Sequence, residues 1–142
     1  MARLHLDIPA DLPFATEIDV RVTDLNYGNH LGNDAMLSLI HEARVRFLAH
    51  LGFNEMDVGG AAIVLSDAAI AYRAEAFLGD RLRFAVGFHD PARVGCDIVY
   101  RVTRRADDRL VAEAKTGIVF LDPATRRPTA IPDAVRAVFG TT

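Results

Sequence analysis

Several residue types are scarce in this sequence. The chain of 142 residues has one cysteine, Cys96, and no tryptophan, and Lys115 is the sole lysine among its 16 basic residues. A lone cysteine excludes an internal disulfide, and its place in a strand-like run predicts a buried side chain that behaves as a small apolar group. Such cysteine usage suits a reducing compartment. We therefore expect a cytoplasmic protein that needs no disulfide or structural metal to hold its fold.

Strong charge of one sign and long apolar runs are also lacking. The net charge is −3, which does not favour a nucleic-acid partner. No segment approaches the roughly 20 apolar residues of a membrane span, and the N-terminus lacks an apolar stretch of signal-peptide length. We therefore expect neither nucleic acid nor a membrane as a partner. By its length the chain, residues 1–142, is predicted to form a single domain.

Common catalytic motifs are absent as well. The sequence has no HExxH pair, no GxGxxG or Walker loop and no GxSxG elbow. Its five histidines show no compact metal-ligand spacing. These absences exclude the usual sequence patterns of zinc proteases, of nucleotide-binding proteins and of serine hydrolases, and we expect no metal site.

The chain does contain a clear change of hydrophobic period. Residues 14–26 alternate apolar and polar side chains, which predicts a half-buried strand. From Asp34 to about Leu51 the apolar residues recur at helical spacing, and few charges interrupt the other faces. A helix that is apolar nearly all round should be buried in the fold. The strand residues predicted to face the core are Ile18, Val20 and Val22.

Strand patterns dominate the rest of the chain. Residues 61–74 show little alternation and are interpreted as a strand buried on both faces, whereas the later patterns alternate. Consecutive strands with short turns predict antiparallel pairing, so the fold class is α+β with a sheet curved around the helix. An edge-to-edge dimer would cover the open edge of such a sheet. The later strands are predicted over residues 80–90, 95–105 and 109–122, and Pro132 begins a short terminal helix.

Polar, turn-forming residues crowd the junction between the first strand and the helix. The stretch DLNYGNHLGND, residues 24–34, has three Asn, two Gly, two Asp and one His. The start of a buried helix offers unpaired N–H groups and the positive end of the helix dipole, and Gly32 lets a ligand oxygen approach the backbone closely. Together these can form an oxyanion hole for attack on an acyl carbonyl. Candidate groups for activating water or attacking the carbonyl are Asp24, Asn26, His30, Asp34 and Glu42.

The same residues also have purely structural explanations. Glycine and asparagine permit a tight turn, and Asn33 or Asp34 can cap the helix. The histidine can be an ordinary loop side chain, and the first aspartate can bond only the turn backbone. Glu42 lies about two turns into the helix and can simply pair with Arg44 or Arg46.

Two segments together resemble a known family. RVTDLNYGNHLGNDAMLSLIHEARVRFL, residues 21–48, and LSDAAIAYRAEAFLGDRLRF, residues 65–84, are similar to the hot-dog-fold acyl-CoA thioesterases of the 4-hydroxybenzoyl-CoA thioesterase type. The resemblance implies a five-stranded antiparallel sheet wrapped around one long central helix, with two chains joined into a continuous sheet and often paired into tetramers. It implies an acyl-CoA or related thioester bound across the subunit interface without a metal or cofactor, so that CoA is present only as part of the substrate. The residues in step with the family pattern are Arg21, Asp24, His30, Asn33, Glu42, Ala43, Arg44, Tyr72, Gly79 and Asp80.

The most serious of three departures from the family pattern is at residue 26; the others are Asn29, where the family has Gly before the His, and Gly32, where it has Asn. The second Asp of the motif, which is the catalytic carboxylate in many members, is Asn26 here, and an amide cannot take a proton at neutral pH. Either Glu42 of the facing subunit replaces it, or His30 or Asp24 does, or the protein binds acyl-CoA and hydrolyses it poorly. We favour Glu42 as the group that activates water, with Asn26 and His30 orienting it, and backbone N–H groups of residues 32–34 polarising the thioester carbonyl. The residues expected to bind substrate are Tyr27, Gly32, Asn33, Asp34 and Ser66, the last either lining the acyl pocket or belonging to the core.

Two other functions fit the same sequence. A hot-dog hydratase or dehydratase would act on acyl thioesters with His30 and a carboxylate, and it would consume enoyl-CoA without releasing a thiol. A binding module would be stabilised by acyl-CoA without hydrolysing it. Thioester hydrolysis is the function that we expect.

Overall fold

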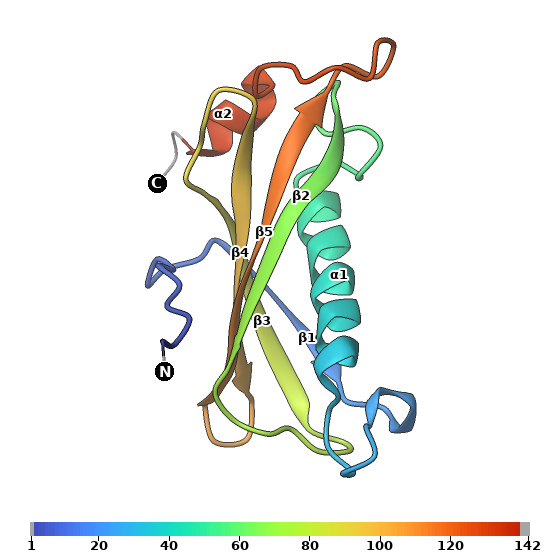
Figure 1. The fold of residues 1–142 in the computed structure, drawn as a ribbon, viewed down its shortest axis with the longest axis vertical. Coiled ribbons are helices and arrows are strands. Elements are labelled where there is room, and N and C mark those ends of the chain that lie inside the picture. Colours follow the sequence, from blue (N-terminus) through green and yellow to red (C-terminus); the bar gives the residue numbers. More distant parts are fainter. Residues whose placement is uncertain (1, 140–142) are drawn as a thin grey trace.

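The computed structural model describes residues 2–139, which form one antiparallel sheet and two α-helices (Figure 1). A short 3₁₀ helix, Val22–Asp24, lies between the first strand and the long helix. The five strands pair in the order β1-β3-β4-β5-β2, so β1 and β2 are the two edges. The elements are β1 (Phe14–Asp19), α1 (Asn33–His50), β2 (Ala62–Tyr72), β3 (Arg81–His89), β4 (Gly95–Arg104), β5 (Arg109–Leu121) and α2 (Asp133–Phe139).

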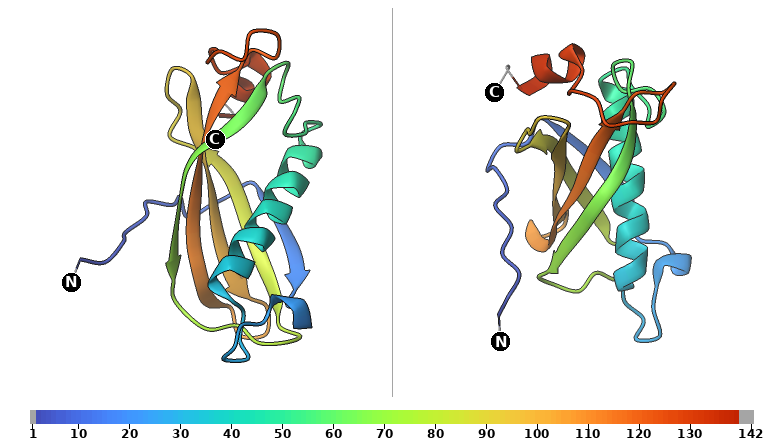
Figure 2. Two further views of the ribbon diagram at one scale, coloured as in Figure 1. Left: turned by 45° about the vertical axis from the view of Figure 1, so that its right-hand side comes forward. Right: turned by 45° about the horizontal axis from the view of Figure 1, so that its top comes forward.

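The long helix α1 lies along one face of the strongly twisted sheet, and the N-terminal segment runs on the opposite side (Figure 2). Arg101 on β4 holds this segment against the sheet. Its guanidinium donates hydrogen bonds to the carbonyls of Ile8 and Ala10, both at 3.2 Å. The five-stranded antiparallel sheet around one long helix is the hot-dog architecture expected from the sequence, and the expected α+β class is confirmed.

Side chains of β3, β4 and β5 make most of the sheet's contribution to the core. The alternate side chains of β3 from Leu82 to Phe88, and those of β4 from Cys96 to Val102, are buried or half-buried, and a helical stripe of α1 packs against the sheet. Apolar burial of this kind stabilises the fold by roughly 25 cal/mol for each Å² removed from water. The buried residues of the stripe are Met36, Leu39, Ile40, Ala43, Phe47 and Leu48.

One cation is buried among these apolar groups. Arg44 is 4% exposed and donates to Glu55 at 2.8 Å, and it lies 3.5 Å from the hydroxyl of Tyr100. That hydroxyl also bonds Thr116 at 2.7 Å. A buried charge is tolerated when it is paired and hydrogen-bonded in this way. The arginine of the family pattern is therefore part of the core.

The first strand and the helix start differ from the sequence expectation. The strand ends at Asp19 rather than continuing to residue 26, and Val22, predicted to face the core, is 69% exposed. The capping residue of α1 is Gly32, with Asn33 and Asp34 inside the first turn, so the predicted side-chain cap is wrong. A glycine cap has no side chain to occupy the free N–H groups of the first turn.

Two burial predictions also fail. The strand β2 is not buried on both faces, because it is an edge strand that pairs only with β5 among residues 2–139, and residues 64–68 are exposed. The helix α1 is not buried all round either, since Leu37 and Val45 on its outer face are 45% and 43% exposed. Both exposed apolar surfaces belong to elements whose sequence pattern is that of a buried segment.

Two local expectations, for Cys96 and for the terminal helix, are confirmed. Cys96 is 6% exposed, and burial raises the pKa of its thiol to about 12, so it is an unreactive core residue. The terminal helix α2 begins at Asp133, directly after Pro132. Neither helix in the described part of the chain is long and apolar enough to cross a membrane.

Candidate active site

The loop before α1 is organised by Asn26. Its side-chain oxygen accepts hydrogen bonds from the N–H groups of Gly28 at 2.9 Å and His30 at 3.3 Å, and its backbone N–H donates to the His30 carbonyl at 2.8 Å. Asn29 has a φ of 65°, a left-handed conformation that asparagine tolerates better than most residues. The asparagine-rich sequence therefore closes a tight turn that presents His30.

The first turn of α1 has free amide groups. The N–H of Leu31 donates to Ala76, and the N–H of Gly32 donates to the carbonyl of Asp24, both through short bonds of 2.8 and 2.9 Å. Gly32 therefore has no free N–H to offer a substrate, contrary to the sequence expectation. Within residues 2–139, the N–H groups of residues 33–35 have no acceptor. These amides and the helix dipole give the site a positive potential.

A hydrogen bond between β2 and α1 fixes the position of this turn. The hydroxyl of Tyr72 donates to the carbonyl of Asn33 at 2.9 Å. Burial, and next the negative charge of Asp34, raise the pKa of the Tyr72 hydroxyl, so it stays a neutral donor. A Cβ atom on Gly32 would lie only 2.8 Å from a carboxylate oxygen of Asp34, so a side chain at this position would require the exposed Asp34 side chain to turn away.

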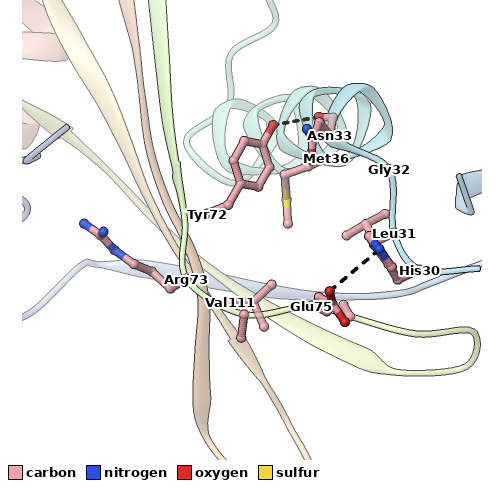
Figure 3. Close-up of a pocket in the computed structure, with 11 residues that line it drawn as sticks. His30, Leu31, Gly32, Asn33, Met36, Tyr72, Arg73, Glu75 and Val111 are labelled. Carbon is pink, nitrogen blue, oxygen red and sulfur yellow. Dashed lines mark hydrogen bonds and ion pairs between the residues drawn. The ribbon is translucent and has the colours of Figure 1, made fainter. Parts of the chain in front are cut away.

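A pocket of about 260 Å³ opens beside the helix start (Figure 3). One wall is the loop and first turn of α1, and the other is the chain as it leaves β2, with a single residue from β5. The pocket floor is apolar, whereas its rim carries an imidazole, a carboxylate and a phenol. The lining residues are His30, Leu31, Gly32, Asn33, Met36, Tyr72, Arg73, Ala74, Glu75, Ala76 and Val111.

His30 and Glu75 face each other at this rim (Figure 3), with 3.8 Å between Nε2 and Oε1. The two backbone donors to the Asn26 oxygen leave its amide nitrogen facing Nδ1 of His30 at 3.4 Å. An amide nitrogen only donates, so Nδ1 is the acceptor and the neutral imidazole carries its proton on Nε2. The proton of His30 is thus directed toward Glu75.

The predicted site residues occupy different places. His30, Gly32 and Asn33 line the pocket, and Asn26 lies directly behind His30. The Asp24 carboxylate is buried and accepts three hydrogen bonds from Arg21, chiefly side-chain bonds that lower its pKa. Both of its oxygens are thereby occupied, so its geometry is that of a structural group.

Other predicted residues lie outside the pocket lining. Tyr27 is fully exposed, and Asp34 is exposed on the first turn of α1. Ser66 is exposed at a β-bulge of the edge strand β2 and does not belong to the core. Glu42 is on the outer face of α1, where it accepts a hydrogen bond from Arg46 at 3.0 Å. The catalytic role expected for Glu42 requires a second chain and stays a prediction.

Sequence reasoning gave no role to three lining residues, Tyr72, Arg73 and Glu75. Tyr72 matches the family pattern, and this match could have identified it as a site residue. The guanidinium of Arg73 pairs with Glu113 at 3.5 Å and points away from His30 (Figure 3). Glu75 lies 45 positions after His30 in the chain, and no local pattern relates the two. Among residues 2–139, no group of three or more His, Cys, Asp or Glu side chains could hold a metal ion.

Comparisons with known proteins give the family and the fold of this chain. The family model of the thioesterase-like superfamily matches residues 20–139. The fold is similar to a 1,4-dihydroxy-2-naphthoyl-CoA thioesterase from Synechocystis, with 22% identity, a TM-score of 0.79, and coverage of 89% of this chain and 95% of that chain. A thioesterase superfamily protein from Jannaschia has 22% identity, a TM-score of 0.83, and coverage of 94% and 84%.

A third similar structure is a Thermus thermophilus thioesterase complexed with coenzyme A and Zn, with 24% identity, a TM-score of 0.76, and coverage of 90% of this chain and 98% of that chain. A comparison with curated proteins gives no match. The likeness to the solved structures concerns the fold, whereas the family model spans the first-strand junction, the pocket and the whole sheet after it. This chain belongs to the thioesterase-like superfamily.

Proposed function

We propose that this protein is an acyl-CoA thioesterase that hydrolyses its substrate to a free acid and CoA. The observation that carries the proposal is the set of free N–H groups of residues 33–35 beside a pocket whose lining includes Gly32 and Asn33. Such amides stabilise the negative charge that develops on a thioester carbonyl oxygen. Removal of one comparable donor in other enzymes costs roughly 10²–10³ in rate.

The reaction needs a group that accepts a proton from water. Water attacks the carbonyl carbon, the C–S bond breaks, and the proton taken from water returns to the leaving thiolate, so that RCO–SCoA and water give RCOOH and CoASH. Neither a metal nor a redox cofactor is required by this chemistry. In the sequence-based hypothesis the base is Glu42 of the facing subunit, and Asn26 and His30 orient the water.

Self-association is part of the proposal. A pocket of about 260 Å³ holds an acyl group but not a whole CoA ester, since pockets for drug-sized ligands have roughly 300–1,000 Å³. Pairing of two β2 edges would cover the exposed residues 64–68 and extend the site across two chains. A dimer or tetramer in the cytoplasm is thus the proposed form.

A thiol-release assay with a panel of acyl-CoA substrates tests this function. We expect stoichiometric appearance of free CoA with one preferred acyl group, chosen by the size of the pocket. Loss of enoyl-CoA absorbance without thiol would instead indicate a hydratase. Thermal stabilisation by acyl-CoA without any thiol release over hours would indicate a binding module, and either result would reject hydrolysis.

A further inference from the structure

The pocket lining contains one carboxylate, that of Glu75, which lies 3.8 Å from His30. We infer that Glu75 is the catalytic base, accepting the proton of the attacking water while His30 positions its carboxylate. This inference rests on the proposed thioester hydrolysis and names the group that performs its proton transfer.

Glu75 is the sole carboxylate among the lining residues of the pocket. Its side chain is 64% exposed, and the only ionic partner found for it within residues 2–139 is His30. The other acidic side chains near the helix start are used differently. The Asp24 carboxylate is ion-paired with Arg21, and Asp34 is not among the residues that line the pocket. Glu75 therefore has both access to the pocket and free lone pairs to accept a proton.

The backbone of Glu75 is held firmly although its side chain is exposed. Arg104 on β4 donates to the Glu75 carbonyl at 2.9 Å, and the N–H of Leu31 donates to the carbonyl of the next residue, Ala76, at 2.8 Å. The second of these bonds joins Glu75's segment directly to the loop that begins α1. The backbone that carries Glu75 and the loop that leads to the free amides thus form one hydrogen-bonded unit, which limits how far the carboxylate can move from the helix start.

His30 is oriented for a positioning role. Asn26 holds Nδ1 from one side, and the ring of Phe77 lies edge-on at 6.5 Å between centroids. The Nε2–H group then points to Glu75 across 3.8 Å, which exceeds a hydrogen bond, and the exposed glutamate side chain can rotate to close it. A donor on one carboxylate oxygen fixes the carboxyl plane and leaves the other oxygen for water.

The asparagine at the family's carboxylate position gains an explanation from this arrangement. A carboxylate there would accept from the same two backbone N–H groups, but it would offer His30 an acceptor where the amide offers a donor. The imidazole proton would then be drawn to Nδ1, away from Glu75. Asn26 therefore selects the tautomer that serves the carboxylate on the other side of the ring.

The test compares kcat and KM for thiol release by Glu75→Gln with those of the wild type. We expect kcat to fall by roughly 10²–10⁴, the usual contribution of a general base, with KM changed little. Glu17→Gln is the matched control, because Glu17 is a glutamate ion-paired with Arg105 outside the pocket, and it should retain wild-type kcat. Thermal unfolding checks that both variants fold.

Two further readouts separate catalysis from structure. Formate added to Glu75→Ala should restore part of the lost rate, because a small carboxylate can enter the vacated space. His30→Ala should lower kcat in the wild-type background and add little in Glu75→Gln, because residues acting as a unit are not additive. Failure of formate to raise the rate of folded Glu75→Ala would count against a proton-accepting role.

The possible results are distinguishable. A Glu75→Gln variant with wild-type kcat, from an active wild type, overturns the inference and leaves thioester hydrolysis standing, and Glu42→Gln then tests the alternative base. A change confined to KM makes Glu75 a binding residue and also overturns it. A wild type that releases no thiol from any acyl-CoA overturns the proposed function together with this inference.

Discussion

The hydroxyl of Tyr72 on β2 donates a hydrogen bond to the carbonyl of Asn33 in the first turn of α1, at 2.9 Å. This bond joins the edge strand of the sheet to the first turn of α1, which carries the free amides (Figure 3). The geometry of the pocket therefore depends on a contact between two residues that are 39 positions apart in the sequence.

Tyr72→Phe tests the importance of this bond. The phenyl ring still lines the pocket, but the hydrogen bond between β2 and the first turn of α1 is lost. A typical hydrogen bond contributes about 1 kcal/mol. We expect kcat/KM for thiol release to fall about fivefold, which is that energy expressed as a rate, with a small decrease in Tm. Hydrolysis at the wild-type rate would show that the amides are positioned without Tyr72.

The loop around Asn26 gives a second prediction. Asn26→Ala removes the acceptor for two backbone N–H groups, so we expect a loss of about 1 kcal/mol in unfolding free energy and at least a tenfold loss of kcat/KM. Asn26→Asp keeps that acceptor and should retain wild-type stability. Urea denaturation and thiol release measure the two effects, and equal stability of the two variants would contradict the role given to the side-chain oxygen.

Self-association can be tested at the edge strand. Leu65 on β2 is 46% exposed, and Leu65→Lys places a charge where two sheets would pair. We expect sedimentation to show a shift from dimer toward monomer by at least tenfold in dissociation constant. Met56→Lys, at an 84% exposed loop residue, is the matched control and should leave the assembly unchanged. An unaltered mass for Leu65→Lys would place the interface elsewhere.

The Arg21–Asp24 pair predicts a dependence of stability on pH. Arg21 donates through its guanidinium and its N–H to the Asp24 carboxylate, which lowers the pKa of Asp24 in the folded state. The unfolded chain therefore binds this proton first, and the stabilisation is present above about pH 4 and is lost as pH falls through the lowered pKa. The stability difference between wild type and Asp24→Asn should be largest near pH 6.

Urea denaturation at several pH values measures this difference. It should shrink as the pH falls below about 4 and through the lowered pKa of Asp24, because both proteins are uncharged at this position once Asp24 is protonated. A difference that stays constant over the whole range would mean that Asp24 acts through its shape rather than its charge.

Local patterns in the sequence predicted most of the fold. The period-2 alternation of β3 and β4 and the helical spacing of α1 identified the buried residues correctly, because alternation and helical repeat follow directly from backbone geometry. Errors occurred at Val22, at β2 and on the outer face of α1. There the apolar pattern predicted burial, but Val22 lies in the 3₁₀ helix after β1, β2 is an edge strand and the outer face of α1 is exposed.

The sequence by itself determined the elements, the polar junction at residues 24–34 and the glycine that leaves the helix start uncovered. These depend on neighbours in the chain, since turn chemistry and helix capping act over a few residues. Only the tertiary structure decided which carboxylate meets His30. Glu75 reaches the imidazole because the chain leaving β2 bonds to the loop before α1, and no local preference encodes a contact across 45 positions.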